Sequence, residues 1–161
     1  TGELDPGVLL YLADKEELSG CGVNNMINKK SGVAGISQLS SDMRDLEVAA
    51  NEGNPKALLA LNMYAYKIKK FIGAYVAAMN GLDLLIFTAG VGENDFNARK
   101  MICTGMEYMG IEVDEDVNHG VKGKDLVISK PSSKVKVMVV TTDEELVIAS
   151  DTQAIVEKLT H

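Results

Sequence analysis

The chain has no tryptophan, only two cysteines and no long apolar run, and each absence narrows what it can be. Cys21 and Cys103 lie far apart in the sequence and lack the spacing of a metal site, so neither a disulfide framework nor a zinc site is expected. This cysteine usage favours a cytoplasmic location. No apolar stretch approaches the ~20 residues that a membrane-spanning helix needs, so the membrane is not an expected partner.

Positive charge is also scarce, because 16 Lys and Arg residues face 23 Asp and Glu residues, for a net charge of −7. An acidic surface repels phosphate backbones, so nucleic acid is not an expected partner. A small phosphate ligand remains possible, because backbone dipoles can bind one inside an acidic protein. The 161 residues are 46% apolar and 24% charged, which is typical of a globular domain. Because the chain starts at Thr1 without a targeting signal, we expect a fragment, an excised domain or a processed chain.

The first half of the chain has the pattern of helices. Helical segments are predicted at residues 5–30, where 24–30 form a second short helix, and at 42–53 and 54–80, with a small-residue loop at 31–37. Asp5 is a candidate N-cap with Pro6 at the first helical position, and Asn54 and Pro55 repeat this start signal. The segment that follows Pro55 carries one apolar stripe, and Asn80 with the next glycine is predicted to end it as a left-handed cap.

Strands alternate with helices in the second half, which predicts an α/β fold with a largely parallel core. Strands are expected at residues 83–88, 111–113, 126–129 and 135–140, and helices at 94–109 and from 142 onward. The apolar run at 83–88 is typical of a central parallel strand buried on both faces. Thr142 and Glu145 form a predicted capping box at the start of the last helix. Residues 1–80 are therefore expected to be mainly helical, and 81–161 to form an alternating β/α core.

A glycine-rich segment after the strand at 83–88 is the first candidate site, and it comprises Gly90, Val91, Gly92, Glu93 and Asn94. Glycines allow a sharp turn and a close approach of the backbone to a ligand. The start of the next helix directs unpaired N–H groups at the same place, at the carboxyl end of a parallel strand where nucleotides bind. Asp95 replaces the third glycine of a dinucleotide fingerprint, and no P-loop lysine follows. A plain strand–helix turn capped by Asn94 is an equally good interpretation.

Two further groups could act on phosphate. Asp42, Met43 and Arg44 begin a predicted helix, where an arginine beside carboxylates can offer a planar fork to phosphate oxygens. Glu144 follows the strand at 135–140 and is placed to hold Mg²⁺. Each group has a simpler explanation, since an exposed ion pair and acidic residues in the first turn of a helix are common. Taken singly, these simpler explanations are favoured.

Taken in order, however, these segments resemble acetate kinases and the related propionate kinases from end to end. The matching segments are GELDP at 2–6, KKSG at 29–32, GIS at 35–37, SDMRD at 41–45, IGAY at 72–75, FTAGVGEN at 87–94 and EELVIA at 144–149. One such segment would be a weak signal, whereas the ordered series is specific. The departures are mild, and one of them is Ala89, which stands where many members of the family have glycine.

The resemblance implies a ribonuclease-H-like domain of the sugar kinase, Hsc70 and actin superfamily, here an incomplete C-terminal domain with an added helical subdomain. It implies Mg²⁺-dependent transfer of phosphate between ATP and acetate or propionate, which gives an acyl phosphate and ADP. Residues 90–94 would hold the adenosine part of the nucleotide, and Asp42 and Met43 would lie near its phosphates. Arg44 would be the catalytic positive group there, and Glu144 would help to hold Mg²⁺. The family also dimerises through its C-terminal domains, which implies a homodimer.

Members of this family are much longer than 161 residues. The resemblance places on the missing part a magnesium-side Asn, a substrate-pocket Arg, a His for the transferring phosphoryl group and a glycine-rich phosphate hairpin. A further active-site Arg would fall just before Thr1. Because acyl-phosphate formation needs positive groups that converge on both reactants, we expect the chain alone to be inactive and to bind nucleotide weakly. Strands that its sheet would normally pair with are also missing, so the sheet is expected to expose an edge or to find a partner.

Two alternatives belong to other classes. The first is a non-catalytic dimerisation or interaction module, for which the apolar helical residues 8–12 are the candidate surface. The second is an unrelated nucleotide-binding α/β protein, in which residues 42–44 and 90–94 would not share a site.

Overall fold

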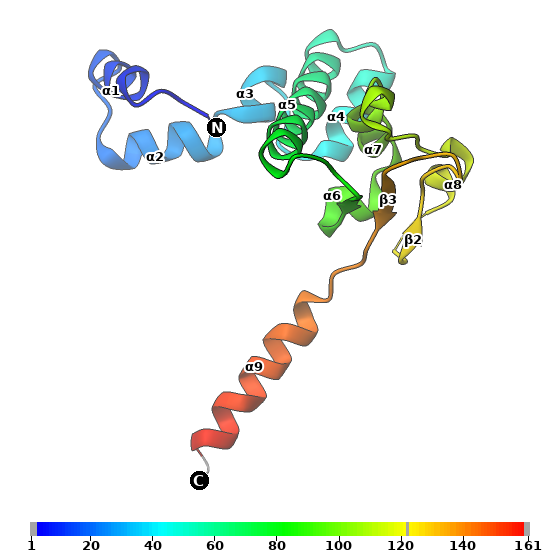
Figure 1. Ribbon diagram of the computed structural model, residues 1–161. Helices are drawn as coiled ribbons and strands as arrows, with labels where there is room; N and C mark the ends of the chain where they lie inside the picture. Colours follow the sequence, from blue (N-terminus) through cyan, green and yellow to red (C-terminus); the bar gives the residue numbers. More distant parts are fainter. Residues whose placement is uncertain (1–2, 122, 160–161) are drawn as a thin grey trace. The chain divides into compact units, whose positions relative to one another are not determined.

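The computed structural model describes residues 3–121 and 123–159, which form helices and a small sheet (Figure 1). The chain divides into two compact units, Thr1–Tyr75 and Val76–His161. The first unit is helical, and the second carries the sheet. No helix in the described ranges is both long enough and apolar enough to cross a membrane.

The first unit contains α1 (Pro6–Lys15), α2 (Gly20–Lys29), α3 (Gly32–Ser37), α4 (Met43–Asn51) and most of α5 (Pro55–Met79). The predicted start signals are confirmed. The Asp5 carboxylate accepts a hydrogen bond from the Val8 amide at 3.0 Å. The Asn54 side chain accepts from the Lys56 and Ala57 amides at 3.0 and 3.2 Å. These caps satisfy amides that have no partner within their own helix.

The loop predicted at residues 31–37 is wrong, because residues 32–37 form α3. Its glycines suggested an open segment, but Gly35 permits a close contact instead. A Cβ at this position would lie 2.7 Å from the Lys30 carbonyl oxygen. The stretch predicted to be helical at 5–30 does contain a second helix, but α2 begins at Gly20 and not at residue 24, because Ser19 caps it through the Gly22 amide at 3.2 Å.

The far end of α5 confirms the predicted left-handed cap, because Asn80 has φ of +60° directly after the helix. The apolar stripe is buried only in its first half. Leu61 and Ala65 are buried, whereas Tyr75 and Met79 are more than half exposed. The spacing of apolar residues at three to four positions identified the helix correctly. It did not show which part of the apolar stripe other elements would cover.

The second unit contains β1 (Leu84–Phe87), α6 (Ala89–Asn94), α7 (Phe96–Cys103), the 3₁₀ helix η1 (Glu107–Met109), α8 (Glu115–Gly120), β2 (Leu126–Val127), β3 (Lys136–Val139) and α9 (Glu144–Leu159). The sheet order is β1-β3-β2, with β1 parallel and β2 antiparallel to β3. The predicted strand at 111–113 is reduced to isolated bridges. The helix predicted at 94–109 is divided into α7 and η1. The α/β class is confirmed, in the form of a small mixed sheet.

The prediction that β1 is central is wrong, since β3 is the middle strand of the described sheet. Val137 and Val139 of β3 are fully buried, whereas Leu84 and Ile86 of β1 are 39% and 49% exposed. An apolar run indicates that a strand can be buried on both faces, but it does not show which strands are present to cover it. The sheet edge expected from the resemblance is exposed here, along β1.

The start of α9 also differs from the prediction. The helix begins at Glu144, and the Asp143 carboxylate caps it by accepting a hydrogen bond from the Leu146 amide at 2.8 Å. The capping box predicted for Thr142 and Glu145 is therefore wrong. Thr142 has a different partner, which is described with the site below.

Candidate functional site

The glycine-rich segment lies directly after the carboxyl end of β1. It is not an open loop, because residues 89–94 form the short helix α6. Ala89, at its first position, has φ of +59°, in the left-handed region that disfavours residues with a Cβ. Thr88, Ala89 and Gly90 are exposed. The backbone thus turns sharply between β1 and α6, and this turn faces solvent.

The two glycines of α6 have different surroundings. A Cβ on Gly92 would lie 3.1 Å from the carbonyl carbon of Phe87, the last residue of β1. A Cβ on Gly90 would meet no atom within 4 Å. The absence of a side chain at Gly92 therefore lets α6 pack on β1. At Gly90 it leaves open space beside an exposed backbone, which a ligand can approach closely.

The cap predicted at Asn94 is wrong. Asp95 caps α7, since its carboxylate accepts a hydrogen bond from the Ala98 amide at 2.8 Å. The Asn94 side-chain amide instead donates to the Gly90 carbonyl at 3.0 Å. Asn94 thus stabilises α6 from within, while Asp95 separates α6 from α7.

Glu93 connects this turn to the chain before α9. Glu93 is 9% exposed, and its carboxylate accepts hydrogen bonds from the Thr142 amide and hydroxyl at 2.9 and 2.7 Å. These bonds lower the pKa of Glu93, with the hydroxyl bond as the largest cause. Because Thr142 lies two residues before Glu144, the bond brings two predicted site segments of the second unit together.

Arg99, on α7, is a residue that the sequence reasoning missed. It is fully buried, and its guanidinium donates to neutral oxygens. Nη1 donates to the Gly92 carbonyl at 2.8 Å, and Nε donates to the Asn118 side chain at 2.7 Å. Nη2 donates to the carbonyls of Asn118 and Val121 at 3.0 and 3.4 Å. Burial lowers the pKa of Arg99, although a guanidinium stays protonated at any ordinary pH.

One sequence signal could have identified Arg99. Its neighbours Ala98, Ile102 and Cys103 are all buried. Ile102 and Cys103 follow Arg99 by three and four residues, so the helical period places the arginine on the apolar face of α7. A charged residue on such a face is either functional or paired with a buried polar group. Asn118 is that group here.

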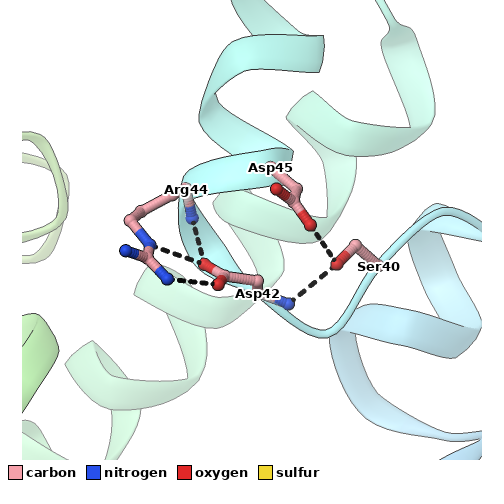
Figure 2. A network of polar contacts seen from close by, with 4 residues as sticks. All are labelled: Ser40, Asp42, Arg44 and Asp45. Atoms are coloured by element: carbon pink, nitrogen blue, oxygen red, sulfur yellow. Dashed lines mark hydrogen bonds and ion pairs between the residues drawn. The ribbon is translucent and has the colours of Figure 1, made fainter.

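The second candidate group lies at the start of α4 in the first unit (Figure 2). The Asp42 carboxylate accepts from the Arg44 amide at 2.9 Å and from Nε and Nη2 of the same residue at 3.2 and 2.7 Å. On the other side, the Ser40 hydroxyl donates to Asp45 at 2.7 Å and accepts from the Asp42 amide at 3.0 Å. Asp42 therefore both caps α4 and holds Arg44 in a fork.

Electrostatics follow directly from this geometry. The Arg44 side-chain hydrogen bond is the largest of the causes that lower the pKa of Asp42 from 3.8 to about 2. The Arg44 side chain is 88% exposed, so most of its guanidinium surface is accessible to a ligand. Met43, between them, is half-buried. The fork orients a cation without covering it.

Glu144 is exposed in the first turn of α9. Across residues 3–121 and 123–159, no three side chains of the acidic, histidine or cysteine type gather closely enough to hold a metal ion. Glu144 therefore does not belong to a cluster of three or more such side chains. A carboxylate in this position can hold an ion whose remaining ligands are mostly waters and the oxygens of a substrate.

Comparison with known proteins identifies the family. Residues 1–150 match the sequence model of the Acetokinase family. The acetate kinase of Porphyromonas gingivalis is 56% identical over 157 residues, which are 98% of this chain and 39% of that protein. Its crystal structure aligns with a TM-score of 0.87 over 97% of this chain and 39% of that chain. A propionate kinase from Francisella tularensis aligns at 35% identity and a TM-score of 0.81, over 92% of this chain and 38% of that one.

These comparisons also set the extent of the likeness. The chain spans about two fifths of the length of the relatives that it matches. Within that span the match is nearly continuous, since the aligned residues make up 98% of this chain in sequence and 97% in structure. With a family match that covers most of its length, the chain belongs to the acetokinase family.

Proposed function

We propose that this chain is the C-terminal, nucleotide-binding part of a kinase that transfers phosphate between ATP and a short carboxylate, acetate or propionate, giving an acyl phosphate and ADP. The observation that carries the proposal is the match of residues 1–150 to the acetokinase family. The aligned structures carry the names acetate kinase and propionate kinase, so both carboxylates stay within the proposal.

In this proposal the turn formed by residues 90–94 holds the adenosine part of the nucleotide. The open space beside Gly90 supports this assignment, because a nucleotide can lie against the exposed backbone there. The carboxylate of Glu93 is occupied by Thr142, so the contribution of Glu93 is to keep the turn in place. Val91, Gly92 and Asn94 shape the same turn.

Arg44 is proposed as the catalytic cation, since phosphoryl transfer is accelerated by fixed positive groups where charge develops. The bidentate contact with Asp42 supports this role, because it restricts the guanidinium before any ligand arrives. Asp42 and Met43 form the neighbouring wall of the phosphate region. Loss of the Arg44 side chain is expected to lower kcat more than it raises the KM for ATP.

Glu144 is the residue of this chain proposed to help hold Mg²⁺. A single exposed carboxylate suits Mg²⁺, which keeps several waters and is bound through one or two carboxylates and the phosphates of a substrate. When bound, the ion neutralises charge on the nucleotide phosphates. Glu144 itself contributes one negative charge at a position that Glu93 and Thr142 connect to the turn after β1.

The decisive test is a coupled acyl-phosphate assay with ATP, Mg²⁺ and either acetate or propionate. It is run on residues 1–161 alone and on a chimera in which they are joined to the part of the P. gingivalis acetate kinase that they do not cover. Activity in the chimera alone supports the function and shows that residues 1–161 are an incomplete site. Activity in residues 1–161 alone would overturn the assignment of essential groups to the missing part, and an inactive, folded chimera would count against the function itself.

A second candidate function is a homodimerisation module within the same kinase, in the cytoplasm. It is favoured by the exposed apolar side chains of α1, where Val8, Leu10 and Tyr11 are 46%, 71% and 63% exposed. Light scattering of residues 1–161 would give a dimer mass that falls to a monomer in Leu10→Glu. A monomer at high concentration before any substitution would contradict the module. The other alternative, a protein unrelated to kinases, is excluded by the family match.

A further inference from the structure

The buried arginine of α7 has an unusual set of partners. The Arg99 side chain is fully buried, yet its hydrogen bonds go to carbonyl and amide oxygens and not to a carboxylate. Burying a cation is costly unless its donors are satisfied. Arg99 meets this requirement because Asn118 accepts from both Nε and Nη2, through its side chain and its carbonyl. Asn118 is itself fully buried and donates to the Phe96 carbonyl at 3.0 Å.

One further hydrogen bond of Arg99 connects it to the turn after β1. Nη1 of Arg99 donates to the Gly92 carbonyl at 2.8 Å. The last carbonyls of any helix lack partners within it, and α6 is only six residues long. Asp95 accounts for the Val91 carbonyl and Asn94 for the Gly90 carbonyl. Arg99 satisfies the Gly92 carbonyl, and its positive charge lies at the favourable end of the helix.

We propose that Arg99 is a positioning residue for nucleotide binding, which acts by holding the Gly92 carbonyl, and with it the turn beside Gly90, in place from the core. This inference rests on the function proposed above for the turn. From α7, the guanidinium donates to α8 and to α6 at the same time, through a planar fork that the compact ammonium group of lysine does not have. Arg99 is remote from solvent, so it acts on a ligand only through the turn.

The test uses Arg99→Lys, which keeps the charge and removes the fork, and Asn118→Ala, which removes the side-chain acceptor of Nε. The matched control is Ile128→Val, a fully buried position of the same unit, where one methylene is lost. Two measurements are made. Hydrogen exchange of the peptide covering residues 89–98 is followed in residues 1–161, and the KM for ATP and kcat are measured in the chimera described above.

The Lys variant is expected to exchange the amides of this peptide about 5-fold faster and to raise the KM for ATP by a similar factor, as the loss of one hydrogen bond predicts. Changes in kcat and in the KM for acetate should stay within about 2-fold, because Arg99 touches no reacting group. The Asn118 variant should shift the same two quantities in the same direction, and the Ile128 control should shift neither. If Arg99→Lys does not fold, hydrogen exchange and the KM for ATP in Asn118→Ala test the proposal.

Two results would overturn the inference. One is unchanged exchange at residues 89–98 in both cluster variants, which would show that the turn is held without Arg99. The other is an equal rise in the KM for ATP in the Ile128 control, which would show that general destabilisation is the cause. Neither result can be confused with a failure of the proposed function. In that case the chimera would be inactive before any of these substitutions is made.

Discussion

The two glycines of α6 provide a sharp prediction, because the same substitution should have opposite consequences two residues apart. Replacing glycine by alanine within a helix gains about 0.5–1 kcal/mol of stability when nothing else changes. At Gly90 the new Cβ meets no atom within 4 Å, so Gly90→Ala should keep most of this gain. At Gly92 the Cβ would lie 3.1 Å from the Phe87 carbonyl carbon, a backbone atom that cannot rotate away.

The size of the effect is the difference in the free energy of unfolding between the two variants. Overpacking of this kind typically costs ~1–3 kcal/mol. Because the composition and the unfolded-chain contribution are the same in both variants, the helix gain cancels and only the overpacking cost remains. Gly92→Ala should therefore unfold with ~1–3 kcal/mol less free energy than Gly90→Ala. For a unit of this size, each 1 kcal/mol corresponds to a shift of roughly 4–8 °C in Tm.

Thermal unfolding of residues 1–161, followed by circular dichroism, measures this difference directly. The KM for ATP in the chimera then separates packing from binding. Gly90→Ala should raise it by about 10-fold or more while stability is kept, since its methyl group fills the space proposed for the nucleotide. Equal stabilities of the two variants would refute the packing argument. An unchanged KM for ATP in a folded Gly90→Ala chimera would refute the placement of the nucleotide beside Gly90.

Three further outcomes are expected. Ala89→Gly should raise the free energy of unfolding by at most about 1 kcal/mol, measured by thermal unfolding, because Ala89 has φ of +59° and glycine adopts this region without strain. Glu93 has a lowered pKa, so its bond to Thr142 stabilises the chain above the ordinary value of 4.5 and is lost as pH falls through the folded value. In Tm measured against pH, Glu93→Gln should therefore be less stable at neutral pH and lose this deficit in acid, and a deficit independent of pH would contradict the linkage. Arg44→Ala should move the pKa of Asp42 from about 2 toward 3.8 in an NMR titration, and an unmoved value would show that the fork is not formed in solution.

Much of the local structure was predictable from the residues. The caps at Asp5 and Asn54 and the left-handed end of α5 at Asn80 were confirmed, because each depends on a side chain and amides a few residues away. The strands β1 and β3 were predicted from apolar runs, and the parallel pairing of β1 with β3 followed from the alternation of strands and helices. The family followed from ordered motifs and was confirmed by the match to residues 1–150.

Other features were mistaken for reasons that lie in the tertiary structure. Residues 31–37 were predicted to be a loop, but a glycine can serve close packing as well as a turn. Thr142 was predicted to cap α9, but it bonds Glu93, and Asp143 is the cap. The roles of individual site residues stay predictions, and the variants described above test those of residues 44, 90 and 93. The boundary expected near residue 80 also stays a prediction.

By itself, the sequence determined the long helices, the strands β1 and β3 and the family of the chain, because caps, helical periods and motif order are properties of neighbouring residues. Only the tertiary structure decided what holds the candidate site together. Glu93 meets Thr142 across 49 residues, and Arg99 meets Asn118 across 19. No local pattern encodes such pairs, since a buried polar group is satisfied by whichever partner the packing of distant elements brings within hydrogen-bond distance. The turn after β1 was visible in the sequence, and the side chains that hold it became visible only in the folded chain.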